Sequence, residues 1–179
     1  MTPSSPDDPA VRQRLLVVLR HGRAESFAEQ DHARRLTERG RRDASELGGW
    51  LARSGVRPYL ALVSSAVRTR ETWELVAASL PGEPEVRTGD DLYSASADTV
   101  LDTVRQVPDD VTTLVYVGHN PTAASLAQVL EDGEPDVEAF VALSHGFPPG
   151  AAALLRVPVA WSGLDAAGAR LVDFHAPTG

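Results

Sequence analysis

Four side chains that are far apart in the sequence have the chemistry to hold and transfer a phosphoryl group: Arg20, His21, Arg68 and His119. Guanidinium groups bind phosphate through charged hydrogen bonds, and an imidazole with a neutral nitrogen is a nucleophile. A phosphate dianion that leaves water must regain several such bonds from the protein. These residue types therefore predict a phosphate site in which an imidazole accepts the phosphoryl group.

The residues beside both histidines favour the close approach of an anion. Gly22 follows His21 and lets the backbone turn or come near a ligand. His119 stands between Gly118 and an Asn-Pro pair, and we expect Asn120 to cap the helix that begins there. The free N–H groups and the dipole of a helix start attract anions. We expect His119 to donate to phosphate, whereas neighbouring arginines keep the His21 ring neutral.

Each of these side chains also has a plainer interpretation. The triplet Arg20–Gly22 is of a kind that is common in solvated turns. Arg68, like the less well placed Arg70, can be an exposed arginine of a helix, and His119 can be a cap or a buried core residue. The functional interpretation therefore depends on the residues lying together.

Short apolar runs predict the strands that bring these residues together. Leu15–Leu19 is wholly apolar and ends directly before Arg20, the pattern of a strand buried on both faces. Apolar residues at helical spacing, with Thr37 and Ser96 as caps, predict surface helices. We expect strands over 15–19, 60–63, 113–117, 151–157 and 169–174, a polar stretch over 82–91, and helices over 37–52, from Ser65 to Pro81, from Ser96 to Pro108, from Asn120 onward and over 137–143.

Strands and helices alternate along the chain, which predicts a single three-layer α/β/α domain with a mostly parallel central sheet over residues 14–179. Residues 1–13, rich in Pro, Ser and Asp, are expected to form a disordered tail. Ligands of such sheets lie beyond the carboxyl ends of the strands. His21 and His119 follow two of these ends, and Arg68 lies one turn into the helix after a third strand.

Composition excludes several partners and chemistries. The 179 residues carry a formal charge of -8 without long Lys/Arg blocks, so nucleic acid and anionic membranes are not expected partners. Cysteine is absent, which removes disulfides, thiolate metal sites and cysteine nucleophiles. The sequence shows no secretory signal or apolar run of membrane-spanning length, so we expect a cytoplasmic location. No pattern indicates an oligomeric state.

Five motifs, in order between about Leu15 and Ala127, resemble those of the histidine phosphatase superfamily, and within it the short SixA-type phosphohistidine phosphatases. They are Leu19-Arg-His-Gly-Arg-Ala-Glu25, Leu36-Thr-Glu-Arg-Gly40 with Ala44, Ser64 with Arg68 and Thr72 in an S-x-x-x-R-x-x-x-T pattern, Leu92-Tyr93, and Val117-Gly-His-Asn-Pro121. The chain beyond Leu130 adds only compatible strands.

The resemblance implies a phosphatase that works in two steps. His21 is then the nucleophile that carries the phosphoryl group until water releases it, and Arg20, Arg68 and His119 bind that group. The resemblance implies no metal and no other cofactor. The substrate is expected to be a phosphorylated protein, in particular one carrying phosphohistidine, or a small phosphomonoester.

Three further residues are expected to contact the substrate: Gly22, Asn120 and Arg23. Arg23 stands where a smaller or acidic residue is frequent in the SixA type. It either binds a second anionic group of the substrate or is solvated, and the sequence favours neither.

The general acid of the reaction has no clear candidate. Larger members of the superfamily supply a carboxylic acid from a longer insertion, whereas the segment 82–98 is short here. Asp90 and Asp91 are possible donors, with Glu25 in reserve, although all three also fit surface carboxylates. Substrates with good leaving groups, such as a phosphoimidazole or an aryl phosphate, depend less on such an acid.

Three other functions compete with the phosphatase. A phosphoglycerate mutase-like phosphotransferase is disfavoured by the short 82–98 segment and the missing acid. A non-catalytic sensor of phosphorylated ligands is disfavoured because His21 and His119 are both present. An α/β domain in which the matching residues are only structural is the remaining alternative.

Overall fold

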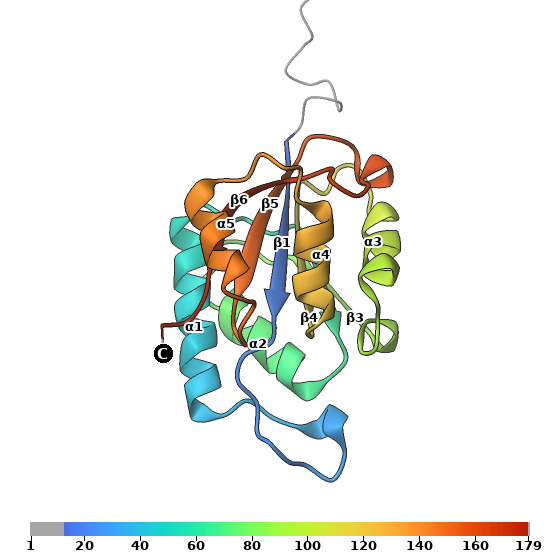
Figure 1. Cartoon of the computed structure of the whole chain (residues 1–179). Helices are drawn as coiled ribbons and strands as arrows, with labels where there is room; N and C mark the ends of the chain where they lie inside the picture. The colour runs from blue at the N-terminus through green and yellow to red at the C-terminus, as the bar shows by residue number, and fades with distance from the viewer. Residues whose placement is uncertain (1–12, 179) are drawn as a thin grey trace, which may run out of the picture.

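The computed structural model describes residues 13–178, which form one α/β domain (Figure 1). Gln13 apart, the tail expected over 1–13 lies outside the described residues. The strands are β1 (Arg14–Arg20), β2 (Leu60–Ser64), β3 (Glu85–Gly89), β4 (Thr113–Gly118), β5 (Ala152–Val157) and β6 (Arg170–His175). The helices are α1 (Glu38–Arg53), α2 (Val67–Ala77), α3 (Ala97–Arg105), α4 (Thr122–Leu130) and α5 (Val137–Ser144), with 3-10 turns η1 (Asp31–Ala33), η2 (Asp90–Leu92) and η3 (Trp161–Gly163).

All six described strands belong to one sheet, in the order β3-β2-β4-β1-β5-β6. Neighbours among β3, β2, β4 and β1 are parallel. β5 is antiparallel to β1, and β6 is antiparallel to β5, so β6 again points along β1. The sheet is therefore mixed, with five of its six strands in one direction, which confirms the predicted α/β class with a mostly parallel sheet.

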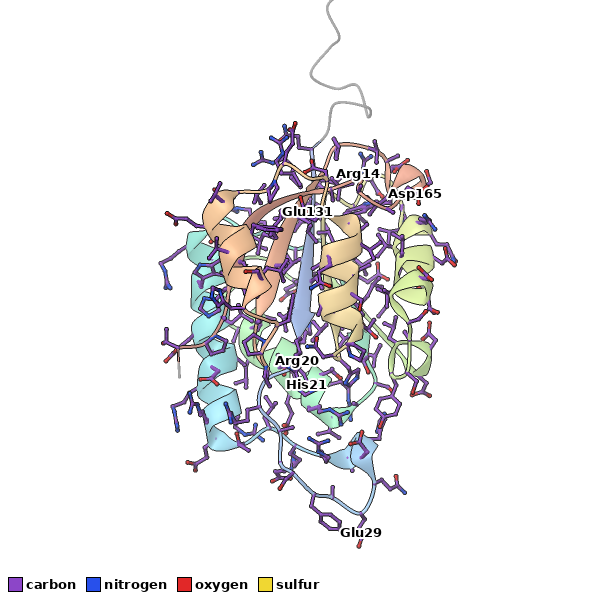
Figure 2. All side chains as sticks on the ribbon, viewed as in Figure 1. Arg14, Arg20, His21, Glu29, Glu131 and Asp165 are labelled. Atoms are coloured by element: carbon purple, nitrogen blue, oxygen red, sulfur yellow. The ribbon has the colours of Figure 1, made fainter. Side chains whose placement is uncertain are left out.

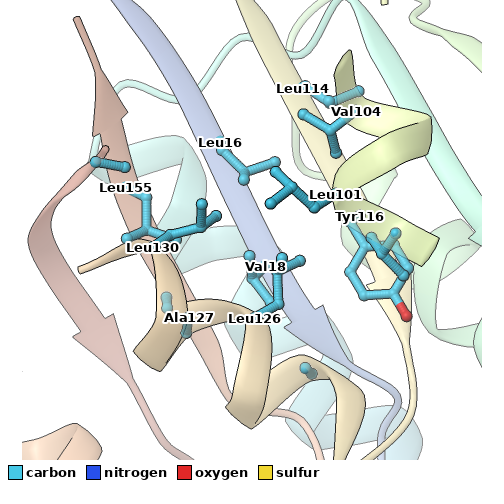
Figure 3. Packing of buried hydrophobic residues seen from close by; sticks show 14 of the residues in the cluster. Leu16, Val18, Leu101, Val104, Leu114, Tyr116, Leu126, Ala127, Leu130 and Leu155 are labelled. Carbon is cyan, nitrogen blue, oxygen red and sulfur yellow. The ribbon is translucent and has the colours of Figure 1, made fainter. Parts of the chain in front are cut away.

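The side chains of β1 alternate between two apolar layers. Leu16 and Val18 pack into the layer beneath α3, α4 and α5 (Figure 3). Val17 and Leu19 pack into the layer beneath α1 and α2. Burial of both faces explains why the run is wholly apolar rather than alternating. It also fixes where the strand emerges from the core, and this determines the position of the residues that follow.

The predicted caps of two helices are present. The Thr37 hydroxyl accepts a hydrogen bond from the Gly40 N–H at 3.0 Å at the start of α1. The Ser96 hydroxyl accepts one from the Thr99 N–H at 3.2 Å at the start of α3. Across residues 13–178, every helix is too short or too polar to cross a bilayer.

One strand was not predicted. β3 lies within the polar stretch 82–91 and pairs with β2 alone, at the edge of the sheet. Its residues are largely exposed, so it carries no apolar run or alternation that the sequence could reveal.

The predicted cap at Asn120 is wrong. α4 begins at Thr122, its N-cap residue is Pro121, and no side chain caps it. The Asn120 amide instead donates to the Phe147 carbonyl at 2.9 Å. The competing acceptor lies 27 residues away in the chain, so the local Asn-Pro pattern could not disclose it.

Candidate active site

Parallel strands end side by side and bring the predicted residues to one edge of the sheet. In the register of β1 with β4, Arg20 is paired with Gly118. His21 and His119 therefore each follow the last residue of one of these two neighbouring strands. β2 lies beside β4 and ends at Ser64, directly before α2. Figure 2 shows Arg20 and His21 at the carboxyl end of β1.

A cavity of about 390 Å³ opens at this edge. The ring centroids of His21 and His119 are 5.2 Å apart, with the planes at 62°. Arg68 contacts both rings, His21 Nε2 through its Nε and His119 Nδ1 through its Nη2. The four residues singled out in the sequence therefore converge, and the cavity is lined by Arg20, His21, Asp31, Arg34, Arg68, Tyr93, Ser94, His119 and Asn120.

The hydrogen bonds of His21 define which of its nitrogens carries the proton. Nδ1 lies 2.7 Å from the Gly22 carbonyl oxygen, which can only accept, so Nδ1 donates. Nε2 then carries a lone pair, and it accepts a 3.3 Å hydrogen bond from Arg68 Nε. The nitrogen on the Arg68 side is therefore the one available for attack on an electrophile.

The His21 ring is held neutral. Burial lowers its pKa to about 3, with the His119, Arg68 and Arg20 charges acting in the same direction. The hydrogen bond to Gly22 opposes this shift. The neighbouring arginines thus act in the expected sense, but burial of a ring that is 8 % exposed is the larger cause.

His119 is oriented by a buried hydroxyl. Its Nε2 is 2.7 Å from Ser64 Oγ, and its Nδ1 is 3.4 Å from Arg68 Nη2. Because a guanidinium only donates, Nδ1 accepts and Nε2 carries the proton. Burial, then the Arg68 charge, lowers the pKa of His119 to about 4. Donation from Nδ1 to a phosphate therefore requires a proton that the ring lacks in this state.

The loop before β5 supports two of the cavity residues from outside. The Phe147 carbonyl accepts hydrogen bonds from Arg20 Nη1 at 2.8 Å and from the Asn120 amide at 2.9 Å. Both Arg20 and Asn120 line the cavity. This contribution of the chain beyond Leu130 had no signal in the sequence, because a main-chain oxygen is present at every position.

Gly22 is a packing residue of the site. Its N–H donates to the Thr72 hydroxyl at 2.9 Å, and its carbonyl accepts from His21. A Cβ added to Gly22 would lie 2.9 Å from the Gly40 carbonyl oxygen, so only glycine allows the start of α1 to come this close. Gly22 is absent from the cavity lining and therefore acts here through the backbone.

A family model described as the histidine phosphatase superfamily (branch 1) matches residues 16–96, which contain His21 and Arg68. The fold is also that of a protein from Nakamurella multipartitia described as a candidate phosphohistidine phosphatase SixA. The two chains are 33% identical with a TM-score of 0.82, over 93% of this chain and 98% of the other. The chain belongs to the histidine phosphatase superfamily. Within it, the similarity is to the SixA type.

Two further proteins similar to this histidine phosphatase come from bacteria. A candidate SixA from Agrobacterium tumefaciens is 30% identical with a TM-score of 0.77, over 92% of this chain and 98% of the other. An uncharacterised protein of Mycobacterium leprae is 37% identical over 82% of this chain and 89% of its own length. The two structural matches cover 93% and 92% of this chain, which is more than the part that contains the five motifs.

The cavity of the histidine phosphatase also contains Asp31, Arg34 and Tyr93, for which the sequence predicts no role. Asp31, in η1, accepts hydrogen bonds from Arg68, from Arg34 and from the hydroxyl of Tyr93. Asp31 and Arg34 lie on the long connection between β1 and α1, whose path no periodic pattern determines. Tyr93 belongs to the Leu92-Tyr93 motif, but this motif does not indicate that its hydroxyl binds Asp31.

Other predicted residues lie outside the cavity. Arg23 is exposed, and its carbonyl accepts from Thr37, so Arg34 rather than Arg23 is the additional arginine at the pocket. Asp90 and Asp91 are exposed in η2, and Glu25 is exposed on the β1–α1 connection; none of them lines the cavity. Within the described part of the chain, no three His, Cys, Asp or Glu side chains cluster closely enough to hold a metal ion.

Proposed function

We propose that this histidine phosphatase hydrolyses a phosphorylated substrate through a covalent phosphohistidine at His21 Nε2. The observation that supports this most strongly is the state of the His21 ring, with its proton fixed on Nδ1 by the Gly22 carbonyl and its lone pair beside Arg68. A neutral imidazole nitrogen beside guanidinium donors is the arrangement that nucleophilic phosphoryl transfer requires.

The first step forms the bond between Nε2 of His21 and phosphorus while the bond from phosphorus to the leaving group breaks. Arg20 and Arg68 bind the equatorial oxygens of the transferring group, and their charges stabilise its transition state. His119 binds the same group once the anion has raised its pKa enough for Nδ1 to gain a proton.

In the second step water attacks phosphorus, the bond to Nε2 breaks and inorganic phosphate leaves. The proton of His21 stays on Nδ1, hydrogen-bonded to the Gly22 carbonyl, throughout, so the ring returns to its starting tautomer. The reaction that we propose uses neither a metal nor another cofactor.

The proposed substrates are phosphohistidine on a protein or a small phosphomonoester. Similarity to proteins described as phosphohistidine phosphatases supports the first, and a cavity of about 390 Å³ has room for either a phosphoimidazole or a small ester. Phosphoimidazole and activated aryl leaving groups such as p-nitrophenolate need little protonation. We propose that the protein is located in the cytoplasm.

The test is turnover of p-nitrophenyl phosphate by the His21→Ala variant. We expect a loss of at least about 10³-fold in kcat, because the covalent intermediate can no longer form at this position. His145→Ala, at an exposed histidine outside the cavity, is the matched control and should retain wild-type activity. Full activity of His21→Ala would contradict the proposal, and efficient isomerisation of 3-phosphoglycerate by the wild type would favour the mutase instead.

A further inference from the structure

The Asp31 carboxylate is held by donors on both of its oxygens. Oδ2 accepts from Arg68 Nη2 at 2.9 Å and from the Tyr93 hydroxyl at 2.5 Å, and Oδ1 accepts from Arg34 Nη1 at 2.8 Å. The main-chain oxygen of Asp31 accepts from Arg68 Nη1 at 2.7 Å. His32 packs edge-on against the Tyr93 ring, with centroids 5.0 Å apart, and so helps to hold the hydroxyl in place. These hydrogen bonds hold the Asp31 carboxylate in a defined position at the cavity.

Asp31 and the nucleophile line the same cavity but differ in how exposed they are. His21 is 8 % exposed and forms the floor, whereas the Asp31 side chain is 53% exposed and forms part of the rim. Arg68 joins the two, since its Nε contacts His21 and its Nη2 contacts Asp31. A phosphoryl group attacked by Nε2 expels its leaving group on the side away from the nucleophile, because the two are in line. The leaving group therefore departs towards the rim.

On the basis of the phosphatase function proposed above, we propose that Asp31 is the catalytic residue that protonates the leaving group. In the first step the Nε2–phosphorus bond forms, the phosphorus–oxygen bond breaks, and the Asp31 proton moves to the departing oxygen. In the second step the attacking water gives a proton back to Asp31, and phosphate leaves as the phosphorus–nitrogen bond breaks. Both steps balance without any further reactant.

The charges around Asp31 allow this change of state. In the empty cavity the hydrogen bonds from Tyr93 and Arg34, and then Arg68, hold the pKa of Asp31 far below its usual range. A bound phosphoryl group takes donors from Arg68 and adds negative charge beside the carboxylate, and both changes raise the pKa. The half-exposed side chain can gain its proton from water. The charged and titratable groups that face or adjoin it are Arg34, Arg68, Tyr93, His32 and His119.

The other candidate acids are less well placed. Asp90 and Asp91 are exposed and do not line the cavity, and Asp91 lies at a separate surface depression together with Leu62 and Arg87. Asp31 is the one carboxylate among the residues that line the cavity in the described chain. The short segment 82–98 therefore need not supply the acid, because the β1–α1 connection does.

The test compares two substrates that differ in how much they need an acid. Phenol has a pKa of about 10 and needs protonation as it leaves, whereas p-nitrophenolate is stable without a proton. The kcat/KM value reports on substrate binding and on the first chemical step, in which the leaving group departs, and not on hydrolysis of the intermediate. For Asp31→Asn we expect the ratio of kcat/KM for p-nitrophenyl phosphate to that for phenyl phosphate to rise by about 100-fold over the wild type.

The matched control is Glu29→Gln, which removes one negative charge from the same loop at its tip, away from His21 (Figure 2). This variant should keep the wild-type ratio. Equal losses on both substrates in Asp31→Asn, or faster turnover of both, would overturn the proposal and indicate a structural or inhibitory carboxylate. A selective loss with phenyl phosphate in Asp91→Asn would do the same. A separate result would show that the proposed phosphatase function is itself wrong: the His21→Ala variant would then keep full activity.

Discussion

The imidazoles of His21 and His119 lie in one cavity but carry their protons on different ring nitrogens. The Gly22 carbonyl fixes the proton of His21 on Nδ1, which leaves Nε2 free to attack. The Ser64 hydroxyl binds Nε2 of His119, which turns Nδ1 towards Arg68. The difference arises from main-chain and hydroxyl partners, so residue type alone does not assign the two roles.

Both rings should remain neutral well below the pH at which an ordinary histidine gains a proton. Burial lowers the pKa of His21 to about 3 and that of His119 to about 4, whereas the unperturbed value is 6.5. In NMR titrations of the unliganded protein, we expect the ring signals of both residues to be unchanged between about pH 8 and about pH 5. A midpoint near 6.5 for His21 would mean that burial does not lower the pKa of this ring and would contradict the account. Addition of inorganic phosphate should shift the His119 signals in the direction of protonation.

At the scale of elements, the connection between β1 and α1 is the part of the fold that builds the rim. Glu71, on α2, holds it by accepting hydrogen bonds from the Leu36 N–H and from Arg35 and Arg41. At the other end, the start of α1 packs directly on the backbone of Arg23. These contacts place Asp31 and Arg34 relative to His21.

A pair of glycine variants on α1 tests this packing. A Cβ at Gly40 would lie 2.1 Å from the Arg23 carbonyl oxygen, whereas one at Gly49 meets only the flexible end of Arg53 at 3.3 Å. We expect Gly40→Ala to lower the free energy of unfolding by about 1–3 kcal/mol and to reduce activity. Gly49→Ala should be neutral or more stable by up to about 1 kcal/mol, because alanine favours the helix. Urea unfolding measures both, and equal stabilities would show that the close approach is unimportant.

The elements that apolar patterns define were predictable from the sequence, and those that depend on single distant contacts were not. β1, β2 and β4 are buried runs whose ends fix where His21, Ser64 and His119 lie. β3 is an exposed edge strand without such a pattern. The place of Asp31 depends on the path of a loop, and the partner of Asn120 is a carbonyl in another loop. Spacing along the chain carries no information about either.

A positively charged cavity is set in a protein whose overall charge is negative. The chain has a formal charge of -8, whereas the cavity lining contains three arginines and one carboxylate with both histidines neutral. The overall field therefore repels an anionic substrate, and capture depends on short-range hydrogen bonds from these arginines. Two buried apolar layers hold the strand ends that carry the site, so the arrangement does not depend on a ligand.

The most direct test of the central claim is to trap the phosphorylated protein. Excess enzyme is mixed with p-nitrophenyl phosphate and quenched within a single turnover in alkaline denaturant, in which a phosphorus–nitrogen bond survives, and the mass is then measured. We predict one added phosphoryl group that maps to His21, forms at least as fast as turnover and is absent from His21→Ala. Turnover without a phosphorylated protein at any quench time, or phosphorylation at another residue, would contradict the account.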